Sequence, residues 1–300
     1  MIFFLSLSIK DSYFKKKYIG VTTKNQKKSI LESADRLGII AGRGVYPLLV
    51  AKGARRSGVE KIFSVCFVSE TDHQMETLST AVEWIRVGQL SKLIQFFKKN
   101  EVKTAIMAGG VAPSHLFELR PDLRAILLLA KLKERNAHTI FGAIAQELEK
   151  NGVILLNATT FLEDQLAPSG QFGGPHIKKR YWEDVEFGFR IAKEVARLDI
   201  GQSVVVKNGT VLSVEAFEGT DEAMKRGGEL GRGSAMLVKV SKPNQDFRFD
   251  VPVIGIKTIE SAQRFGIGTI VCESAKTLIL EKEKVVSLAD QTKTSLIGFP

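Results

Sequence analysis

From Leu37 onward the sequence alternates short apolar runs with amphipathic segments of helical period, and this alternation constrains the fold more than any other feature. The strand-like runs are residues 37–41, 61–68, 82–87 and 105–108. Helical patterns at 47–56 and 91–99 separate them. This order is typical of a parallel sheet whose crossovers carry helices. We therefore predict a Rossmann-like α/β domain for residues 37–165.

The second half of the chain follows a stretch rich in Gly and Pro and has a different pattern. The run Ala167-Pro168-Ser169-Gly170-Gln171-Phe172-Gly173-Gly174-Pro175 is the densest group of these residues, so we predict a linker or hinge at 166–178. Beyond it, Asn208-Gly209 separates two strand-like runs, which indicates a hairpin with a primed turn. Further strand-like and helical segments follow. We therefore predict a mixed α+β domain for residues 179–300.

The basic residues are unevenly distributed along the chain. The formal net charge is +10, but residues 1–36 hold eight Lys and Arg against three acidic residues, which accounts for half of that excess. The remainder is spread over residues 37–300 and falls short of a nucleic-acid footprint. We therefore expect no nucleic-acid partner, and we interpret residues 1–36 as a basic leader outside the fold.

Neither the cysteines nor the apolar segments indicate export or a membrane span. Cys66 and Cys272 lie in strand-like runs without metal-ligand spacing, which suggests buried residues in a reducing compartment. The apolar start at residues 1–9 lacks the basic region of a signal peptide. No later run approaches the roughly 18 apolar residues of a transmembrane helix. We therefore expect neither export nor a membrane span from these features.

Gly42-Arg43-Gly44 follows the first predicted strand and precedes the helix that begins at Pro47. Backbone N–H groups and the helix dipole could face a phosphate at such a turn, and Arg43 favours an anion. The turn is only the beginning of a dinucleotide fingerprint, because the third glycine would fall at Pro47 and no clear ribose acid lies about 20 residues on. A plain turn and a phosphate-binding loop both remain open.

Carboxylates gather in Glu215-Ala216-Phe217-Glu218-Gly219-Thr220-Asp221, at a predicted strand-to-helix junction. Oxygen ligands for a hard divalent cation such as Mg²⁺ could converge there. The same residues also suit a helix N-terminus, with Thr220 as N-cap and with Asp221 and Glu222 complementing the helix dipole. Capping and metal binding are compatible, so both readings remain open.

Asp250 stands among apolar residues in Arg248-Phe249-Asp250-Val251-Pro252-Val253-Ile254-Gly255. Such surroundings disfavour an ionised carboxylate unless a cation or hydrogen-bond donors hold it, so Asp250 is a candidate metal ligand or base. An Asp that caps a turn before Pro252 is the alternative. Lys242 and Lys257 lie on either side of Asp250 in the sequence, where they could bind phosphate, although a solvated lysine is the commoner outcome.

Several segments carry more information in their order and spacing than any of them carries alone. They are Gly42-Arg43-Gly44-Val45-Tyr46-Pro47, Arg197-Leu198-Asp199-Ile200-Gly201-Gln202, Val214-Glu215-Ala216-Phe217-Glu218-Gly219-Thr220-Asp221 and Asp250-Val251-Pro252-Val253-Ile254-Gly255. Together they resemble the LpxI family, the UDP-2,3-diacylglucosamine pyrophosphatases of lipid A synthesis. The likeness runs from about Leu37 to Phe299.

The resemblance implies a reaction and a catalytic centre. The reaction is Mg²⁺-dependent hydrolysis of the pyrophosphate bond of UDP-2,3-diacylglucosamine, in which water attacks the sugar-side phosphorus and UMP leaves. Asp250 matches the essential Asp of the family and is the expected catalytic residue and metal ligand. Asp221 is the second catalytic candidate. Glu215 and Glu218 are expected to join both aspartates at the metal.

The expected substrate contacts are small residues and cations that could surround a pyrophosphate. They are Gly42, Arg43, Gly44, Gly109, Gly110, Gly219, Thr220, Lys242 and Lys257. The segment Gly109-Gly110-Val111-Ala112-Pro113 departs from the Gly-Asn-Val-type loop expected after the strand at 105–108, which puts an Asn contact in doubt. The lipid substrate further implies a cytoplasmic location with transient contact with the inner-membrane surface. The residues leave the oligomeric state open.

Other classes of function compete with this reading. A nucleotide- or lipid-binding protein could keep the fold without catalysis, but Asp250 and the acidic segment 215–221 argue against it. An oxidoreductase built on the first domain is disfavoured by the incomplete glycine fingerprint. Binding of a uridine nucleotide, as opposed to NAD(P)H, would separate the oxidoreductase from the other two.

Overall fold

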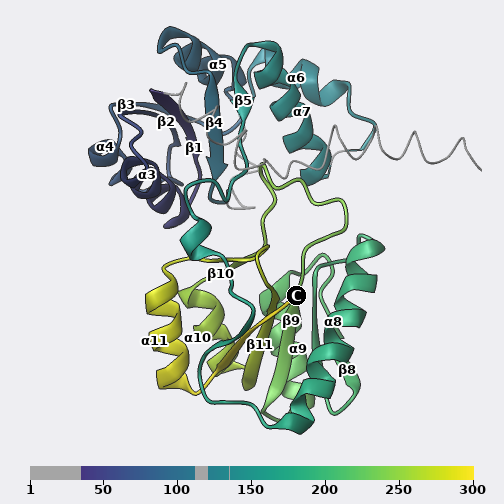
Figure 1. The fold of residues 1–300 in the computed structure, drawn as a ribbon. Coiled ribbons are helices and arrows are strands. Elements are labelled where there is room, and N and C mark those ends of the chain that lie inside the picture. Colours follow the sequence, from purple (N-terminus) through teal and green to yellow (C-terminus); the bar gives the residue numbers. More distant parts are fainter. Residues whose placement is uncertain (1–34, 112–120, 135) are drawn as a thin grey trace, which may run out of the picture.

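The computed structural model describes residues 35–111, 121–134 and 136–300. The predicted leader, 1–36, lies almost entirely outside these residues. Its last residue, Arg36, already belongs to the fold, because it begins the first strand and pairs in register with Lys61. The structure forms two domains stacked one above the other (Figure 1). Among the described residues, no helix has the length and apolar character that crossing a membrane requires.

Within the described part of the N-terminal half, five parallel strands form one sheet in the order β3-β2-β1-β4-β5. The strands are β1 (Arg36–Ala41), β2 (Lys61–Phe67), β3 (Ala81–Ile85), β4 (Thr104–Ala108) and β5 (Ile154–Leu155). The helices are α3 (Tyr46–Arg56), α4 (Met75–Leu78), α5 (Leu90–Lys99), α6 (Leu123–Ala130) and α7 (Ala137–Lys150). The predicted parallel α/β domain is confirmed.

Strand β1 shows why helices cover both faces of this sheet. Leu37, Ile39 and Ala41 point to the core under α3 and α4, whereas Ile40 points to the opposite core, under α5, α6 and α7. This period of two, in a strand with no polar side chain after Arg36, is typical of a strand buried on both sides. The chain adds β2 and β3 on one side of β1 and β4 and β5 on the other. The strand order therefore reverses between β1 and β4, where open α/β sheets bind ligands.

The C-terminal half forms a mixed sheet, which confirms the predicted α+β character. In the described residues from 168 to 300, its strand order is β6-β13-β11-β9-β7-β8. The strands are β6 (Gly170–Gly173), β7 (Ser203–Lys207), β8 (Thr210–Val214), β9 (Ala235–Lys239), β11 (Ile267–Glu273) and β13 (Ser295–Phe299). The helices are α8 (Trp182–Arg197), α9 (Thr220–Gly231), α10 (Ile256–Arg264) and α11 (Lys282–Thr292). The turn at Asn208-Gly209 has positive φ at both residues, 48° and 69°, as a type I′ hairpin requires.

Four residues of the predicted linker, 166–178, lie inside the C-terminal sheet. They form β6, which pairs antiparallel with β13 at the sheet edge. Gly174 has a φ of +69°, and a Cβ there would lie 2.0 Å from the carbonyl oxygen of Thr294. The glycines in this segment therefore serve close backbone packing as well as a change of direction.

The chain returns to the N-terminal domain after β9. The amide of Ala158 donates to the carbonyl of Phe247 over 2.8 Å. Next, β10 (Val253–Ile254) pairs in parallel with β12 (Leu278–Ile279) between the domains. Leu278 is fully buried in the core under α3. Segments of the C-terminal half are thus packed into the N-terminal domain, and they carry Asp250 with them.

Candidate active site between the two domains

The loops after β1 and β4 touch each other at the point where the strand order reverses. The amide of Gly42 donates to Ala108 over 2.8 Å, and that of Arg43 donates to the carbonyl of Gly110 over 2.7 Å. A Cβ on Gly42 would lie 2.5 Å from the same carbonyl, so only glycine permits this approach. Gly109 has a φ of +87° at the facing position. The two glycine-containing turns therefore form one continuous floor.

A cavity of about 300 Å³ opens above this floor. It is lined by both halves of the chain. The N-terminal domain contributes Arg43, Gly44, Val45, Tyr46, Met107, Gly109, Gly110 and Ala158, and the C-terminal half contributes Phe249, Asp250, Val251, Val253 and Leu280. The first N–H groups of a helix lack intrahelical partners, and those of α3 begin at this wall. The floor and wall therefore suit an anion.

Asp250 is carried into the cavity by a tight turn. The amide of Asp250 donates to the carbonyl of Asp246 over 2.9 Å, and the side chain of Arg248 makes a forked ion pair with the Asp246 carboxylate, 2.6 Å at its shortest. Burial alone would raise the pKa of Asp246, but hydrogen bonds from the side chain and backbone of Arg248 outweigh it and lower that pKa. On the far side, the carbonyl of Pro252 accepts from Leu278 over 2.9 Å. Asp250 is thus held from both directions.

Phe249 forms an aromatic wall beside Asp250. Its ring centroid lies 5.7 Å from that of Phe141 and 5.9 Å from that of His138, both on α7. These spacings are within the range of favourable aromatic contacts. Helix α7 therefore packs against the chain segment that presents the carboxylate.

Glu70 lies behind Arg43, and the sequence did not single it out. It follows the carboxyl end of β2, its side chain is fully buried, and its Oε2 lies 3.9 Å from Nε of Arg43. Rossmann-type sheets often carry an acidic residue near this place, but Glu70 comes 28 positions after Gly42. Its position after the predicted strand 61–68 was the signal that could have found it. A buried carboxylate here orients the Arg43 guanidinium.

The acidic segment 215–221 lies outside this cavity. Glu215 is buried and accepts from the hydroxyl of Ser203 over 2.7 Å and from that of Thr220 over 2.8 Å. Glu218 pairs with Arg226 at 3.3 Å. These bonds fix the start of α9 to the sheet edge. Gly219, with a φ of +87°, is the N-cap in place of the predicted Thr220.

The predicted metal site is not assembled in the structure. Among the described residues, no group of three or more His, Cys, Asp or Glu side chains lies close enough to hold a metal ion. Asp221 is exposed in the first turn of α9, where it complements the helix dipole. Glu215 and Glu218 are engaged as described above. Among the described residues that line the cavity, Asp250 alone carries a carboxylate side chain.

The two lysines predicted to flank Asp250 do not line the cavity either. Lys242 forms an ion pair with Asp199 at 2.5 Å, and Lys257 is exposed on α10. Sequence proximity to Asp250 did not translate into spatial proximity, because the turn at 246–250 carries Asp250 toward the N-terminal domain. Of the predicted substrate contacts, Arg43, Gly44, Gly109 and Gly110 line the cavity, and Gly42 lies in its floor.

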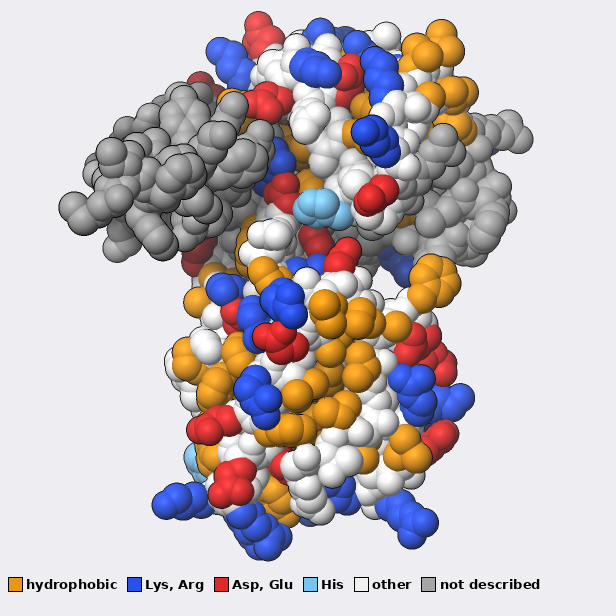
Figure 2. All heavy atoms as spheres, turned by 90° about the vertical axis from the view of Figure 1, so that its right-hand side faces the viewer, with side chains coloured by type: hydrophobic (Ala, Val, Ile, Leu, Met, Phe, Trp, Pro, Cys, Tyr) orange, Lys and Arg blue, Asp and Glu red, His pale blue; other side chains and the backbone are white. Residues whose placement is uncertain are grey.

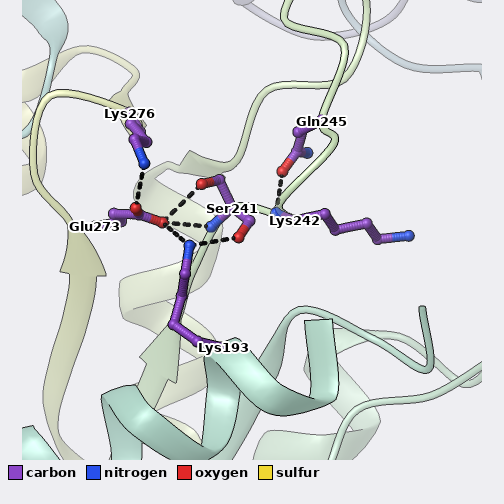
Figure 3. Close-up of polar contacts among 6 residues, drawn as sticks. All are labelled: Lys193, Ser241, Lys242, Gln245, Glu273 and Lys276. Atoms are coloured by element: carbon purple, nitrogen blue, oxygen red, sulfur yellow. Dashed lines mark hydrogen bonds and ion pairs between the residues drawn. The ribbon is translucent and has the colours of Figure 1, made fainter. Parts of the chain in front are cut away.

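A polar network anchors the start of the segment that leads to Asp250 (Figure 3). Glu273, at the end of β11, accepts from Lys193 (3.0 Å), from Lys276 (2.6 Å) and from the Ser241 hydroxyl and amide (2.7 and 2.9 Å). Burial would raise the pKa of Glu273, but these hydrogen bonds outweigh it and lower the pKa to about 2. The side chain of Lys242 points away from this network. Ser241 is thereby fixed where the chain leaves the C-terminal sheet.

The arrangement suits chemistry on a phosphate ester or anhydride. Backbone donors and Arg43 can bind anionic oxygens, while Asp250 can accept a proton from water or orient it. A larger hollow of about 410 Å³ lies elsewhere, beside the start of α8. Its buried carboxylate, Asp184, is already engaged by the amides of Asn208 and Gly209 at 2.9 and 2.6 Å. The cavity at Asp250 is therefore the stronger candidate.

Solved structures resemble this chain only weakly. The biotin carboxylase domain of a thermophilic 2-oxoglutarate carboxylase bound to ADP is 15% identical, with a TM-score of 0.26 over 64% of this chain and 32% of that one. The corresponding domain dimer from Hydrogenobacter thermophilus also gives 15% identity and a TM-score of 0.26, over 59% and 35%. These scores are too low to bear on fold or function.

Sequence comparison is more informative. A curated relative from Caulobacter vibrioides, UDP-2,3-diacylglucosamine pyrophosphatase LpxI, is 30% identical over 275 residues, covering 88% of this chain and 97% of the relative. The model of the LpxI N-terminal domain matches residues 36–165, and that of the LpxI C-terminal domain matches residues 168–297. Because these two models together span nearly all of the described residues, the chain belongs to the LpxI family.

Proposed function

We propose that this protein hydrolyses UDP-2,3-diacylglucosamine to UMP and 2,3-diacylglucosamine 1-phosphate in lipid A synthesis. Water attacks the sugar-side phosphorus, the bond from that phosphorus to the bridging oxygen breaks, and UMP leaves. The name of the Caulobacter relative supports the substrate. The observation that carries the proposal is the placement of Asp250 in a cavity floored by the glycine turns after β1 and β4.

Each part of the cavity then has a role in this reaction. The start of α3 binds the pyrophosphate through its first backbone N–H groups, and the glycine turns, which lack side chains, let the phosphates approach closely. Arg43, oriented by Glu70, reinforces that contact with a full positive charge. Asp250 orients the attacking water and takes its proton. Because Asp250 comes from the C-terminal half and the turns from the N-terminal half, the reacting groups meet only where the halves meet.

We further propose that Mg²⁺ takes part. Mg²⁺ is usually bound through one or two carboxylates together with substrate phosphates. The single carboxylate of Asp250 fits an ion that arrives with the pyrophosphate, whereas the predicted set of four carboxylates does not form. When bound, the ion would neutralise charge on the pyrophosphate oxygens. Because the substrate carries acyl chains, we also propose that the protein contacts the inner-membrane surface transiently.

The test is release of UMP from UDP-2,3-diacylglucosamine in detergent micelles, with Mg²⁺ or with excess EDTA. We expect the Asp250→Ala variant to lose at least about 10²-fold in kcat, as removal of a general base does. The Asp221→Ala variant is the matched comparison, because that aspartate is exposed outside the cavity lining. It should retain activity within about threefold of wild type, since loss of its helix-dipole contact costs well under 1 kcal/mol.

Other outcomes would change the assignment. Equal losses in both variants would bring the acidic segment 215–221 back into the catalytic site. Full activity of Asp250→Ala would remove the residue on which the proposal rests. Absence of UMP release from folded wild-type protein, combined with uridine-nucleotide binding, would leave a binding protein on this fold. Undiminished activity in EDTA would contradict the role of Mg²⁺.

A further inference from the structure

Helix α6 exposes its apolar stripe, where a surface helix normally exposes its polar face. Leu123, Ile126 and Leu127 are 71%, 48% and 53% exposed, and Ala130 is also exposed. Their spacing of i, i+3, i+4 and i+7 places all four on one side of the helix. A contiguous exposed apolar stripe of this kind marks an interaction surface more often than scattered single residues do.

The opposite side of α6 is firmly attached to the domain. Asp122 caps the helix by accepting from the amide of Ala125 over 2.9 Å, and it accepts from the amide of Ser91, on α5, over 2.6 Å. Ala125 is buried, and Arg124 pairs with Glu147 of α7 at 3.3 Å. The helix is therefore fixed in orientation. Its apolar stripe faces outward because the fold holds it there.

Exposed cations follow the stripe directly. Lys131 and Lys133 both lie on the surface just after the end of α6, where they outnumber the exposed Glu134. On the face seen in Figure 2, hydrophobic side chains gather at an upper corner of the N-terminal domain, beside Lys and Arg side chains. Apolar residues bordered by cations are complementary to a bilayer surface that carries anionic headgroups.

The stripe is also connected to the candidate active site. Helix α6 packs on α7, through the contact of Arg124 with Glu147. Helix α7 in turn contacts Phe249 through Phe141 and His138, next to Asp250. A lipid surface bound at α6 would therefore lie on the helix pair that packs against Phe249, and Phe249 lines the catalytic cavity.

We propose that α6 docks this protein on an anionic lipid bilayer. Leu123, Ile126 and Leu127 enter the acyl-chain boundary, and Lys131 and Lys133 contact the headgroups. The biological reason for docking rests on the proposed function, since a diacylated substrate resides in a bilayer. The binding itself is a property of the surface. It can be measured without substrate, so its failure is distinguishable from failure of the hydrolysis.

The experiment is co-sedimentation of the full chain with vesicles of phosphatidylethanolamine and phosphatidylglycerol, and with vesicles of phosphatidylcholine alone. We expect the Leu123→Gln/Ile126→Gln/Leu127→Gln variant to bind anionic vesicles at least about tenfold more weakly than wild type. The matched control is Ile154→Gln/Leu230→Gln, which removes two exposed apolar side chains elsewhere and should bind as wild type. Release of UMP in micelles should be unchanged in both variants.

A labelling experiment covers the case in which the triple variant does not fold. Cys66 and Cys272 are buried, so a Leu123→Cys variant can be labelled selectively with a polarity-sensitive fluorophore. Its emission should shift to the blue with anionic vesicles, whereas that of a labelled Leu230→Cys variant should not. Absence of the shift, or undiminished vesicle binding by the triple variant, overturns the proposal. So does loss of a dimer in the triple variant with unchanged vesicle binding, which would make α6 an interface between copies of this chain.

Discussion

Asp250 and Glu215 show how the surroundings of a carboxylate decide its role. Both stand out in the sequence as candidate metal ligands. Glu215 accepts hydrogen bonds from Ser203 and Thr220, which occupy both of its oxygens in holding α9 to the sheet. Asp250 is held through its backbone and lines the cavity. A carboxylate positioned by its backbone keeps its side chain available for chemistry.

Gly42 is the residue at which the contact between the two floor loops can be tested. We predict that Gly42→Ala lowers kcat/KM for UMP release at least about tenfold, because a Cβ 2.5 Å from the carbonyl of Gly110 must separate the loops. The control is Gly142→Ala in α7, where a Cβ meets nothing within 4 Å. That variant should be as active as wild type and equally or more stable. Wild-type kinetics in Gly42→Ala would show that the loop contact does not shape the site.

Glu273 gives the protein a specific pH dependence of stability. Its folded pKa of about 2 lies below the ordinary 4.5, so its ion pairs stabilise the fold fully above about pH 4.5. This contribution is lost as the pH falls toward 2, and it is on the order of 3 kcal/mol. We predict that Glu273→Gln has a lower Tm than wild type at pH 7 and that the two Tm values converge as the pH falls from 5 toward 2.

The control for this prediction is Glu194→Gln. It removes an exposed ion pair with Arg197, which should contribute little at any pH. Thermal unfolding followed by circular dichroism between pH 2.5 and 7 gives the comparison. A Tm difference between Glu273→Gln and wild type that stays constant over this range would assign the effect of Glu273 to packing and not to its charge.

At the scale of elements, local sequence patterns predicted most of the strands, helices and turns that depend on neighbouring residues. The alternation from Leu37 onward gave the strands and helices of the parallel domain, and Asn208-Gly209 gave the hairpin, because both signals are local. The strand order is set by packing, so the reversal between β1 and β4 could not be read from the residues. For the same reason Glu70 was missed, and the contact between Gly42 and Gly110 was not foreseen.

The candidate site was predicted in part, and the errors have a common cause. Asp250 and the glycine turns meet as expected, whereas Lys242, Lys257 and the acidic segment 215–221 do not reach the cavity. The spacing of residues in the sequence indicates which residues are unusual. It does not indicate that the turn held by Asp246 and Arg248 directs Asp250 toward the N-terminal domain and away from the residues that lie near it in the sequence. The outward direction of the apolar stripe on α6 depends on contacts with α5 and α7, so it could not be read from the sequence either.

At the scale of the whole molecule, the cavity lies where C-terminal residues such as Leu278 enter the N-terminal core. The described C-terminal core under α10 and α11 shares no residues with the core under α5, α6 and α7. Contact between the halves runs through β10, β12 and the turn at 246–250. A ligand that occupies the cavity touches both halves at once. Its binding energy therefore stabilises their contact as well as each wall.

We predict that UMP raises the Tm of the whole chain in a single transition. At a concentration about 100 times its Kd, a ligand adds about 2.7 kcal/mol of stability, which corresponds to a shift of roughly 5 °C or more for a chain of this size. Asp250→Ala should keep or enlarge this shift, because it removes a negative charge near the phosphate. Gly42→Ala should reduce it, because the floor of the cavity changes. Differential scanning calorimetry with and without UMP measures both, with NADH as the control ligand. If Asp250→Ala abolishes the shift while Gly42→Ala preserves it, Asp250 acts in binding and the glycine turns do not.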